Sequence, residues 1–342
     1  MKILKGDILI QFLIGASVLA TGGGGSYEKA KNLLKNTSVN LNGLNELNSN
    51  DIVCTVFGVG GKQVNDPVKS AVNAFQVFKK LFTEKVTAII PVEIGPLASA
   101  ISIFIADKIN LPIVDADIVG MRSSPEVFLE TITLKNLKRE PSVIANESDA
   151  AILYRSRSYE MTENFFRNFA EQSGGDAFVV GYPLRIKEIK DVVARGSVSA
   201  SIQIGKDLGK VEEGKKCLKE FCIRNYFKYI GEGKIVKEQK EVKKGFTVGK
   251  YIIKLTKESF LEVVIKNENI VCIKNKSVIV TTPDLICLIE KESLIGTNNF
   301  SKNINKDVIV LAKKAIPIWR SKKGRELFSP KNLGLNFKQK LL

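Results

Sequence analysis

The stretch VTAIIPVEIGPLASAISIFIADKINLPIVDAD, residues 86–117, decides the fold. Residues 86–92 and 111–114 form short apolar runs, which is typical of buried strands in a parallel sheet. Between them, after Gly95 and Pro96, residues up to 108 have the pattern of an amphipathic helix. The stretch therefore predicts a strand–helix–strand unit with a right-handed crossover.

The same alternation extends upstream. Residues 51–58 (DIVCTVFG) are rich in β-branched and apolar side chains and predict a strand that the glycines Gly58, Gly60 and Gly61 end. Pro67 then begins a helix that runs to about residue 85, at the first helical position that proline favours. This β-α-β-α-β succession predicts a largely parallel sheet in a three-layer α/β/α domain. Ligands of such sheets bind beyond the carboxyl ends of the strands, where loops 58–61, 93–96 and 115–126 fall.

A run of glycines separates two predicted helices near the start of the chain. Residues 5–20 form an apolar helix, the run Thr21-Gly22-Gly23-Gly24-Gly25 follows, and a second helix starts near Ser26. Its clustered N–H groups could hold an anion or a carbonyl oxygen of a substrate. The run is no nucleotide fingerprint, because it follows no strand and lacks the Lys-Ser/Thr of a phosphate loop. The alternative is a tight helix-to-helix turn, but four consecutive glycines exceed what a turn needs.

Carboxylates mark the ends of two neighbouring predicted strands. Glu93, Asp115 and Asp117 should meet at the carboxyl edge of the sheet, where one pKa could rise toward neutrality and give an acid and a base. The same oxygens could hold Mg²⁺ or another hard cation. Helix capping and loop hydrogen bonds are the structural alternative for the aspartates. In the same loop, Arg122 and Glu126 could clamp an anionic group or form a surface ion pair.

Composition excludes several kinds of chemistry. The chain has no histidine, which rules out Ser-His-Asp triads, Cys-His pairs and histidine metal sites. Its net charge of +16 raises the question of nucleic acid. However, lysines are interspersed with glutamates in residues 234–250, and aromatic residues do not alternate with the basic ones as in a stacking platform, so nucleic-acid binding is not expected.

Localisation follows from two further features. Residues 8–20 are apolar but fall short of the roughly 20 residues that span a membrane, and we expect them to form a buried helix. The five cysteines contain no C-x-x-C pair, which suits reduced thiols in a cytosol. We therefore expect a cytoplasmic protein without membrane contact.

The pattern changes in the second half of the chain. Short β-like runs over residues 131–154 precede a helix at 160–172, a strand at 177–182 and a helix at about 197–208. Beyond Asn225, alternating residues with frequent turns predict a smaller antiparallel β-rich domain. We therefore expect a site-bearing α/β domain over residues 1–211, a β-rich domain over 225–315, and a tail at 316–342 that returns to the first domain. Turn formation explains the polar strings Asn267-Glu268-Asn269 and Pro283-Asp284.

Eight strings, in order, resemble the S-methyl-thiohydantoin desulfurase-like family, formerly a domain of unknown function associated with hydantoinase/oxoprolinase subunits. They span nearly the whole chain: Thr21 to Gly25 with Tyr27, Glu93-Ile94-Gly95, residues 111–117, Gly196-Ser197-Val198-Ser199, residues 245–249, Asn267-Glu268-Asn269, residues 283–286 and residues 330–334. The resemblance implies a three-layer α/β domain joined to a smaller β-rich one. It also places the glycine run and Gly95 in a substrate site. Pro96 and Ala98 stand where the family usually has glycine and asparagine.

Two functions remain open on these grounds. The first is a hydrolase-like enzyme for a small cyclic amide, imide or thiohydantoin-type ring, in which Asp115 or Asp117 activates water and Glu93 protonates the leaving group or holds a divalent metal. The glycine N–H groups would polarise the ring carbonyl. The second is a non-catalytic partner subunit of a hydantoinase-type enzyme, or a metabolite-binding protein, with a homo-oligomer as a further expectation.

Overall fold

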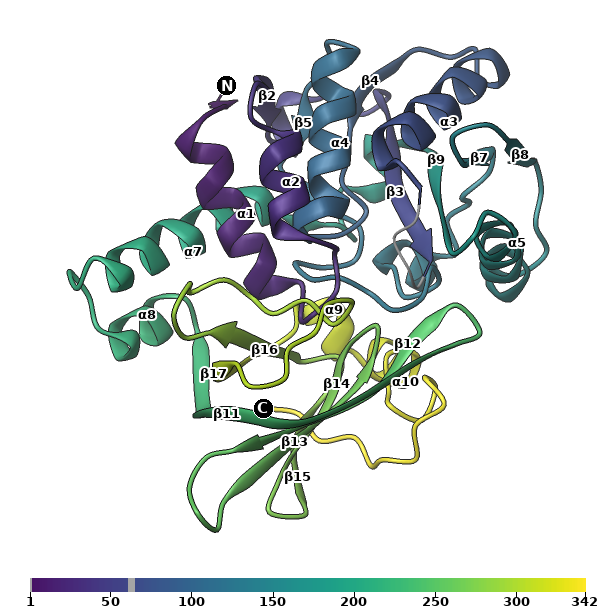
Figure 1. Ribbon diagram of the computed structural model, residues 1–342. Coiled ribbons are helices and arrows are strands. Elements are labelled where there is room, and N and C mark those ends of the chain that lie inside the picture. The colour runs from purple at the N-terminus through teal and green to yellow at the C-terminus, as the bar shows by residue number, and fades with distance from the viewer. Residues whose placement is uncertain (1, 61–64) are drawn as a thin grey trace.

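The computed structural model describes residues 2–60 and 65–342 and has an α/β part joined to an antiparallel sheet (Figure 1). The first part is built on a sheet in the order β1-β2-β5-β4-β3-β9-β7-β8. Its strands are β1 (Lys2–Leu4), β2 (Val39–Asn42), β3 (Ile52–Gly60), β4 (Val86–Ile89), β5 (Ile113–Val114), β7 (Ser142–Ala145), β8 (Ala150–Leu153) and β9 (Asp176–Arg185). The predicted two-domain α/β class is confirmed.

Parallel and antiparallel pairing divide this sheet. Strands β2, β5, β4 and β3 are parallel to one another, which confirms the pairing expected for the strand–helix–strand units. The flanking strands β1, β9, β7 and β8 pair antiparallel, so the sheet is mixed. Strand β4 ends before Pro91, earlier than expected, and β5 begins after Pro112, later than expected, because proline has no N–H to donate. Strand β3 reaches Gly60, which pairs with Asp176; Gly61 lies outside the described residues.

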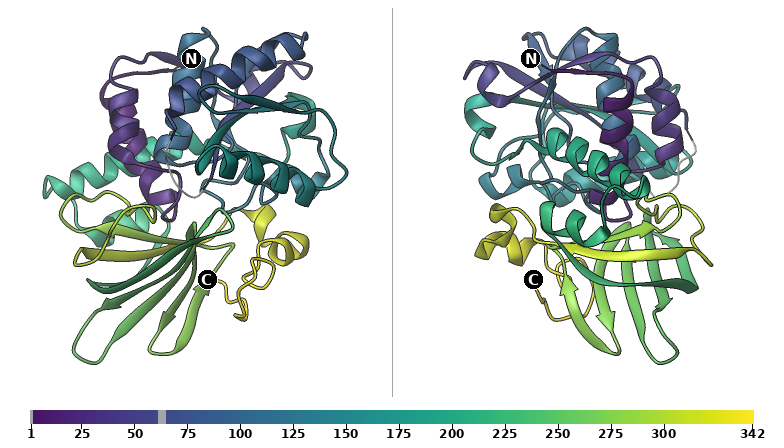
Figure 2. Two further views of the ribbon diagram at one scale, coloured as in Figure 1. Left: turned by 45° about the vertical axis from the view of Figure 1, so that its right-hand side comes forward. Right: turned by 90° about the vertical axis from the view of Figure 1, so that its left-hand side faces the viewer.

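Helices cover both faces of the sheet. The residues of β3 alternate: Cys54 and Val56 pack into one hydrophobic cluster, and Val53 and Phe57 pack into the other. The first cluster includes residues of α1 (Asp7–Leu19), α2 (Tyr27–Leu33), α3 (Pro67–Leu81) and α4 (Pro96–Lys108), and the second includes Phe166 of α5 (Tyr159–Gln172). The layered arrangement is visible from several directions (Figure 2).

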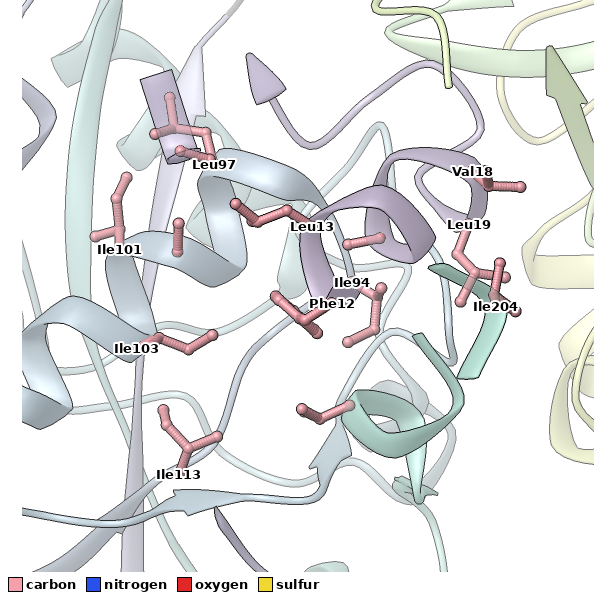
Figure 3. Packing of buried hydrophobic residues seen from close by; sticks show 14 of the residues in the cluster. Phe12, Leu13, Val18, Leu19, Ile94, Leu97, Ile101, Ile103, Ile113 and Ile204 are labelled. Carbon is pink, nitrogen blue, oxygen red and sulfur yellow. The ribbon is translucent and has the colours of Figure 1, made fainter. Parts of the chain in front are cut away.

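Helix α4 is buried on most of its surface, whereas the sequence predicted an amphipathic helix. Leu97, Ile101 and Ile103 are nearly inaccessible to solvent. Phe12 and Leu13 of α1 lie beside them (Figure 3). Helix α4 needs no polar face because the sheet packs on one side and α1 and α2 pack on the other.

The remaining elements precede the second sheet in the chain. Residues 131–135, predicted as β-like, form a 3₁₀ helix, in which the Thr133 N–H bonds to the Glu130 carbonyl. These elements are η1 (Leu44–Glu46), η2 (Thr131–Lys135), α6 (Ile186–Ile189), α7 (Ser197–Glu212), α8 (Leu218–Arg224) and the two-stranded pair β6 (Ala116–Asp117) and β10 (Ala194–Arg195). None of the described helices combines the length and hydropathy needed to cross a bilayer.

The second sheet is antiparallel throughout and curved like half a barrel, in the order β15-β14-β13-β12-β11-β17-β16 (Figure 2). Its strands are β11 (Phe227–Lys243), β12 (Phe246–Lys254), β13 (Phe260–Lys266), β14 (Glu268–Lys274), β15 (Ser277–Thr281), β16 (Leu285–Glu290) and β17 (Asp307–Lys313). Two short helices, α9 (Pro317–Arg320) and α10 (Lys322–Leu327), follow. From α9 the buried Trp319 donates its Nε1–H to the Val119 carbonyl of the first part, so the tail contacts the α/β domain.

Candidate functional site

The glycine run packs directly on the start of α4. The Gly24 carbonyl accepts hydrogen bonds from the N–H groups of Leu97 (2.8 Å) and Ala98 (3.1 Å). A Cβ on Gly24 would lie 2.4 Å from the Cα of Gly95, so the two backbones meet at a distance that only glycines allow. This close approach explains why both positions, which lie about seventy residues apart in the sequence, are occupied by glycine.

The same run also contacts the second sheet. The Thr21 carbonyl accepts from the Asn269 N–H, and the Gly22 carbonyl accepts from the Asn299 N–H, both at 2.8 Å. A Cβ on Gly23 would lie 2.0 Å from Oε1 of Glu268. The glycine run is thus fixed between the two domains, with one side on each.

A cavity of about 120 Å³ opens beside this run. Residues of both domains line it, and those of the second domain are Asn267, Glu268 and Phe300. The first domain contributes Gly24, Gly25, Phe57, Gly58, Val59, Gly60, Val92, Glu93, Leu97, Ala98, Ile101, Val119, Ser124, Glu126, Val127, Glu130, Arg167, Asp176 and Phe178. Of the residues predicted from the sequence, the cavity brings together Glu93, Gly24, Gly25 and Glu126.

Glu93 is the predicted carboxylate that lines the cavity. It follows β4 at the carboxyl edge of the sheet, and its Oε2 accepts the Ser124 N–H at 3.0 Å. The pKa of Glu93 is raised to about 7, mainly by burial and to a smaller extent by the nearby carboxyls of Asp117 and Glu130, against the hydrogen bonds from Ser124 and Ser123. Near neutral pH this carboxyl is therefore present in both protonation states.

Glu268 faces the same cavity from β14, at the position where the sequence predicted only a turn. Its Oε2 is buried and has no hydrogen-bond partner among the described residues. Burial raises the pKa of Glu268 well above its ordinary value, and Glu93 adds to this, while Arg122 and Arg167 oppose it. The signal in the sequence is an acidic residue between Asn267 and Asn269, at the start of an otherwise apolar strand.

Three other charged residues that line the cavity form ion pairs. Glu126 forms a buried ion pair with Lys266 of β13, rather than the surface pair with Arg122 that the sequence allowed. Glu130 pairs with Arg139, and Arg167 pairs with Glu163, each at 2.7 Å. Within the described chain, no lysine or arginine forms an ion pair with Glu93 or Glu268.

The two predicted aspartates lie outside the cavity lining. Asp115 accepts hydrogen bonds from the N–H (3.0 Å) and Oγ–H (2.6 Å) of Ser199 in the first turn of α7, which is the capping alternative. Asp117 is fully buried and accepts the N–H groups of Gly120 (2.6 Å) and Met121 (2.8 Å). Burial raises the pKa of Asp117 to about 7. Both aspartates shape loops next to the site, and neither contacts the cavity.

Arg122 is also held away from the cavity. Its guanidinium is fully buried, donates to the carbonyls of Ser123 and Pro283, and lies over the ring of Phe328 at 4.4 Å. Burial lowers the pKa of Arg122 to about 10. Thr21, Gly22, Gly23 and Gly95, also predicted as substrate-binding residues, do not line the cavity. The described residues contain no group of three or more Asp, Glu, Cys or His side chains arranged to hold a metal ion.

The fold and the site define a two-domain α/β protein with a carboxylate-lined cavity where its domains meet. Residues 8–156 match the model of the S-Me-THD-like N-terminal domain, and residues 157–342 match that of the S-Me-THD-like C-terminal domain. The chain therefore belongs to the S-Me-THD-like family, as the sequence resemblance indicated.

Comparison with solved structures finds a similar fold. A crystal structure of a protein from Chromobacterium violaceum is similar with a TM-score of 0.83 and 19% sequence identity, covering 100% of this chain and 99% of that one. This likeness shows a shared fold over the full length. No curated protein matches the chain.

Proposed function

We propose that the protein is a hydrolase that acts on a small cyclic amide, imide or thiohydantoin-type ring bound in the cavity. The observation that carries the proposal is that Glu93 and Glu268, two buried carboxyls that form no ion pair in the described chain, share one cavity beside the glycine run. Membership of the S-Me-THD-like family is consistent with a thiohydantoin-related function.

The two carboxyls suit complementary roles. Glu93, with a pKa near 7, acts as the base that removes a proton from water as the water oxygen attacks the ring carbon. Glu268, whose pKa burial raises well above its ordinary value, donates a proton to the nitrogen or sulfur that leaves as the ring C–N or C–S bond breaks. The reaction consumes one water and changes no oxidation state.

The glycine run supports the developing negative charge. The N–H groups of Gly24 and Gly25 donate to no acceptor in the described part of the chain, and both residues line the cavity. N–H groups that point at a carbonyl oxygen stabilise the tetrahedral intermediate of acyl transfer. We assign this role to Gly24 and Gly25.

The test is turnover by purified protein. Hydantoin, 2-thiohydantoin, S-methyl-thiohydantoin and simple lactams are incubated with the protein, with and without added divalent cations, and products are followed by mass spectrometry. We expect one ring to be consumed, and Glu93→Gln to lower the rate by about 100-fold or more, as loss of a general base does. Glu258→Gln, at an exposed glutamate of the loop before β13, is the matched control.

Two outcomes would contradict the proposal. Consumption of no ring under any condition would remove the hydrolase assignment, as would a Glu93→Gln protein that is folded and fully active. Ring binding without turnover, or co-purification with a large hydantoinase-type subunit, would instead support the alternative of a metabolite-binding partner protein.

A further inference from the structure

We infer that the outer edge of β8 is a dimerisation surface, to which the same strand of a second copy of this chain adds in antiparallel orientation. Strand β8 (Ala150–Leu153) is the last strand of the first sheet and lies at the margin of the α/β part (Figure 1). The inference does not depend on the proposed function. Three features of this edge favour a second copy as the occupant: it is uncovered, its backbone groups point outward, and its sequence is complementary to itself.

The other edges of the two large sheets are short or carry a covering segment. On β15, the Thr281 N–H donates to the Lys340 carbonyl of the C-terminal tail, and on β16 the Leu288 carbonyl accepts the Thr297 N–H. Strand β1 has three residues, the first of which is Lys2. Strand β8 has no proline, glycine or charged residue, and its outer edge receives no hydrogen bond from the described part of the chain. An uncovered apolar edge is a template for a further strand.

The side chains of β8 alternate between the core and the solvent. Ala151 and Leu153 pack into the second hydrophobic cluster, which includes Phe166 of α5. Ile152 points to the opposite face and is 46% exposed, and Tyr154, which follows the strand, is 74% exposed. The edge therefore presents apolar side chains that a second copy would cover.

The backbone groups on the outer side of β8 belong to Ala150 and Ile152. The Asn146 N–H bonds to the Asp149 carbonyl and closes the turn between β7 and β8. Hydrogen-bonded and non-hydrogen-bonded pairs alternate from this turn, so Ala150 and Ile152 form non-hydrogen-bonded pairs with their β7 partners. Their N–H and C=O groups therefore face away from β7, where a strand of a second copy can bond to them.

The sequence around Ile152 is complementary to itself in the antiparallel direction. With Ile152 opposite Ile152 of the second copy, Ala150 lies opposite Tyr154. Ala151 likewise lies opposite Leu153, so each of these pairs joins a small residue to a large one. The register also places Ala150 and Ile152 at hydrogen-bonding positions, which matches the outward direction of their backbone groups.

The charges on either side of the strand follow the same symmetry. Glu147 and Asp149 precede β8, and Arg155 and Arg157 follow it. The same register sets Asp149 opposite Arg155 of the second copy. It also brings Glu147, which contacts the exposed Lys69 at 3.7 Å, toward Arg157. Neither arginine forms an ion pair within the described residues, so both are available to the acids of a second copy.

The test is analytical ultracentrifugation of the full chain at concentrations up to about 0.2 mM. An interface of one strand from each copy is at the small end of specific interfaces, so we expect a monomer–dimer equilibrium in the micromolar range. Ile152→Lys places two like charges opposite each other at the symmetry axis and should weaken the dimer by about 10-fold or more. Val242→Lys, at an exposed apolar residue of β11, is the matched control and should leave the dimer unchanged.

Reversal of charges tests the register. Asp149→Arg alone or Arg155→Glu alone should weaken the dimer several-fold, because each sets like charges opposite one another. The variant with both substitutions restores opposite charges across the interface and should regain most of the lost affinity.

Four outcomes would overturn the inference. They are a monomer at every concentration, a dimer that Ile152→Lys leaves intact, equal weakening by Ile152→Lys and Val242→Lys, and no recovery in the variant with both charges reversed. Of these, a monomer at every concentration would leave the edge of β8 to a strand of another protein. The turnover assay of the proposed function is a separate measurement, so failure of one result leaves the other standing.

Discussion

Replacement of Gly24 by alanine tests whether the close contact of the glycine run with α4 holds the site together. Gly24 has φ +69, a conformation that costs an L-residue about 1–2 kcal/mol. A Cβ there would also lie 2.4 Å from Gly95 Cα and 2.8 Å from Ser123 Oγ. The nearer atom belongs to the backbone, so relief requires the two segments to move apart, which typically costs about 1–3 kcal/mol more. The expected total loss of unfolding free energy is about 2–5 kcal/mol.

The chain contains a matched control for the backbone part of this loss. Gly196 has φ +73, close to that of Gly24, but a Cβ there would meet nothing within 4 Å. Gly196→Ala should therefore lose only about 1–2 kcal/mol. The difference between the two variants isolates the contact with Gly95.

The assay is urea denaturation followed by the fluorescence of Trp319, the single tryptophan of the chain, which is buried and bonded to Val119 across the domain junction. The unfolding free energies of wild type, Gly24→Ala and Gly196→Ala are compared in one buffer. Equal losses in the two variants, or no loss in Gly24→Ala, would refute the packing argument. If Gly24→Ala does not fold in buffer alone, its urea denaturation is measured again in a saturating concentration of the ring ligand.

Three further predictions follow from the site and its supports. The raised pKa of Glu93 favours the folded state below about pH 4.5, and this effect is lost as the pH rises through about 7. In urea unfolding, Glu93→Gln should therefore be more stable than wild type by up to about 3 kcal/mol at pH 8 and nearly equal to it at pH 4.5. Equal stability of the two proteins at both pH values would contradict this. Trp319→Ala should lose about 3–5 kcal/mol of unfolding free energy, measured by circular dichroism melting, because a fully buried side chain and its hydrogen bond to Val119 are removed. A loss under 1 kcal/mol would argue against a contribution of the C-terminal tail to the contact between the domains. Asp115→Asn should lose about 1 kcal/mol of unfolding free energy, because its hydrogen bonds to Ser199 are weakened, and should still bind the ring. Abolished turnover with unchanged stability would instead favour the catalytic role predicted from the sequence.

Local patterns predicted the elements of the first domain because those patterns are set by neighbours in the chain. The apolar runs at 51–58 and 86–92 and the proline at position 67 each determine a strand or a helix without help from distant residues. The same patterns do not encode strand direction: β9 is an apolar run like β4, yet it pairs antiparallel with β3. They also could not show that α4 is covered on its second side by α1 and α2.

The candidate site was only half visible in the sequence for a related reason. Glu93 follows β4 at the carboxyl edge of the first sheet, where topology predicts a site, and the glycine run reaches it through the contact of Gly24 with Gly95. Glu268 reaches them from the second sheet, and no local pattern states how two domains dock. Asp115 and Asp117 occupied the expected edge as well, but their oxygens are taken up by backbone and Ser199 donors. A carboxylate at a strand end can cap a neighbouring helix or face the ligand, and the deciding residue, Ser199, lies on a distant element.

The division of the site between two domains links ionisation to domain docking. Glu93 comes from the first domain and Glu268 from the second, and Glu93 helps to raise the pKa of Glu268. Ionisation of both would place two like charges across the junction in a region of low dielectric, which favours separation of the domains. A bound ring that donates N–H groups to these carboxyls would reduce the repulsion and stabilise the junction in the same event. Ligand binding and domain docking should therefore reinforce each other, most strongly above pH 7, where Glu93 is ionised.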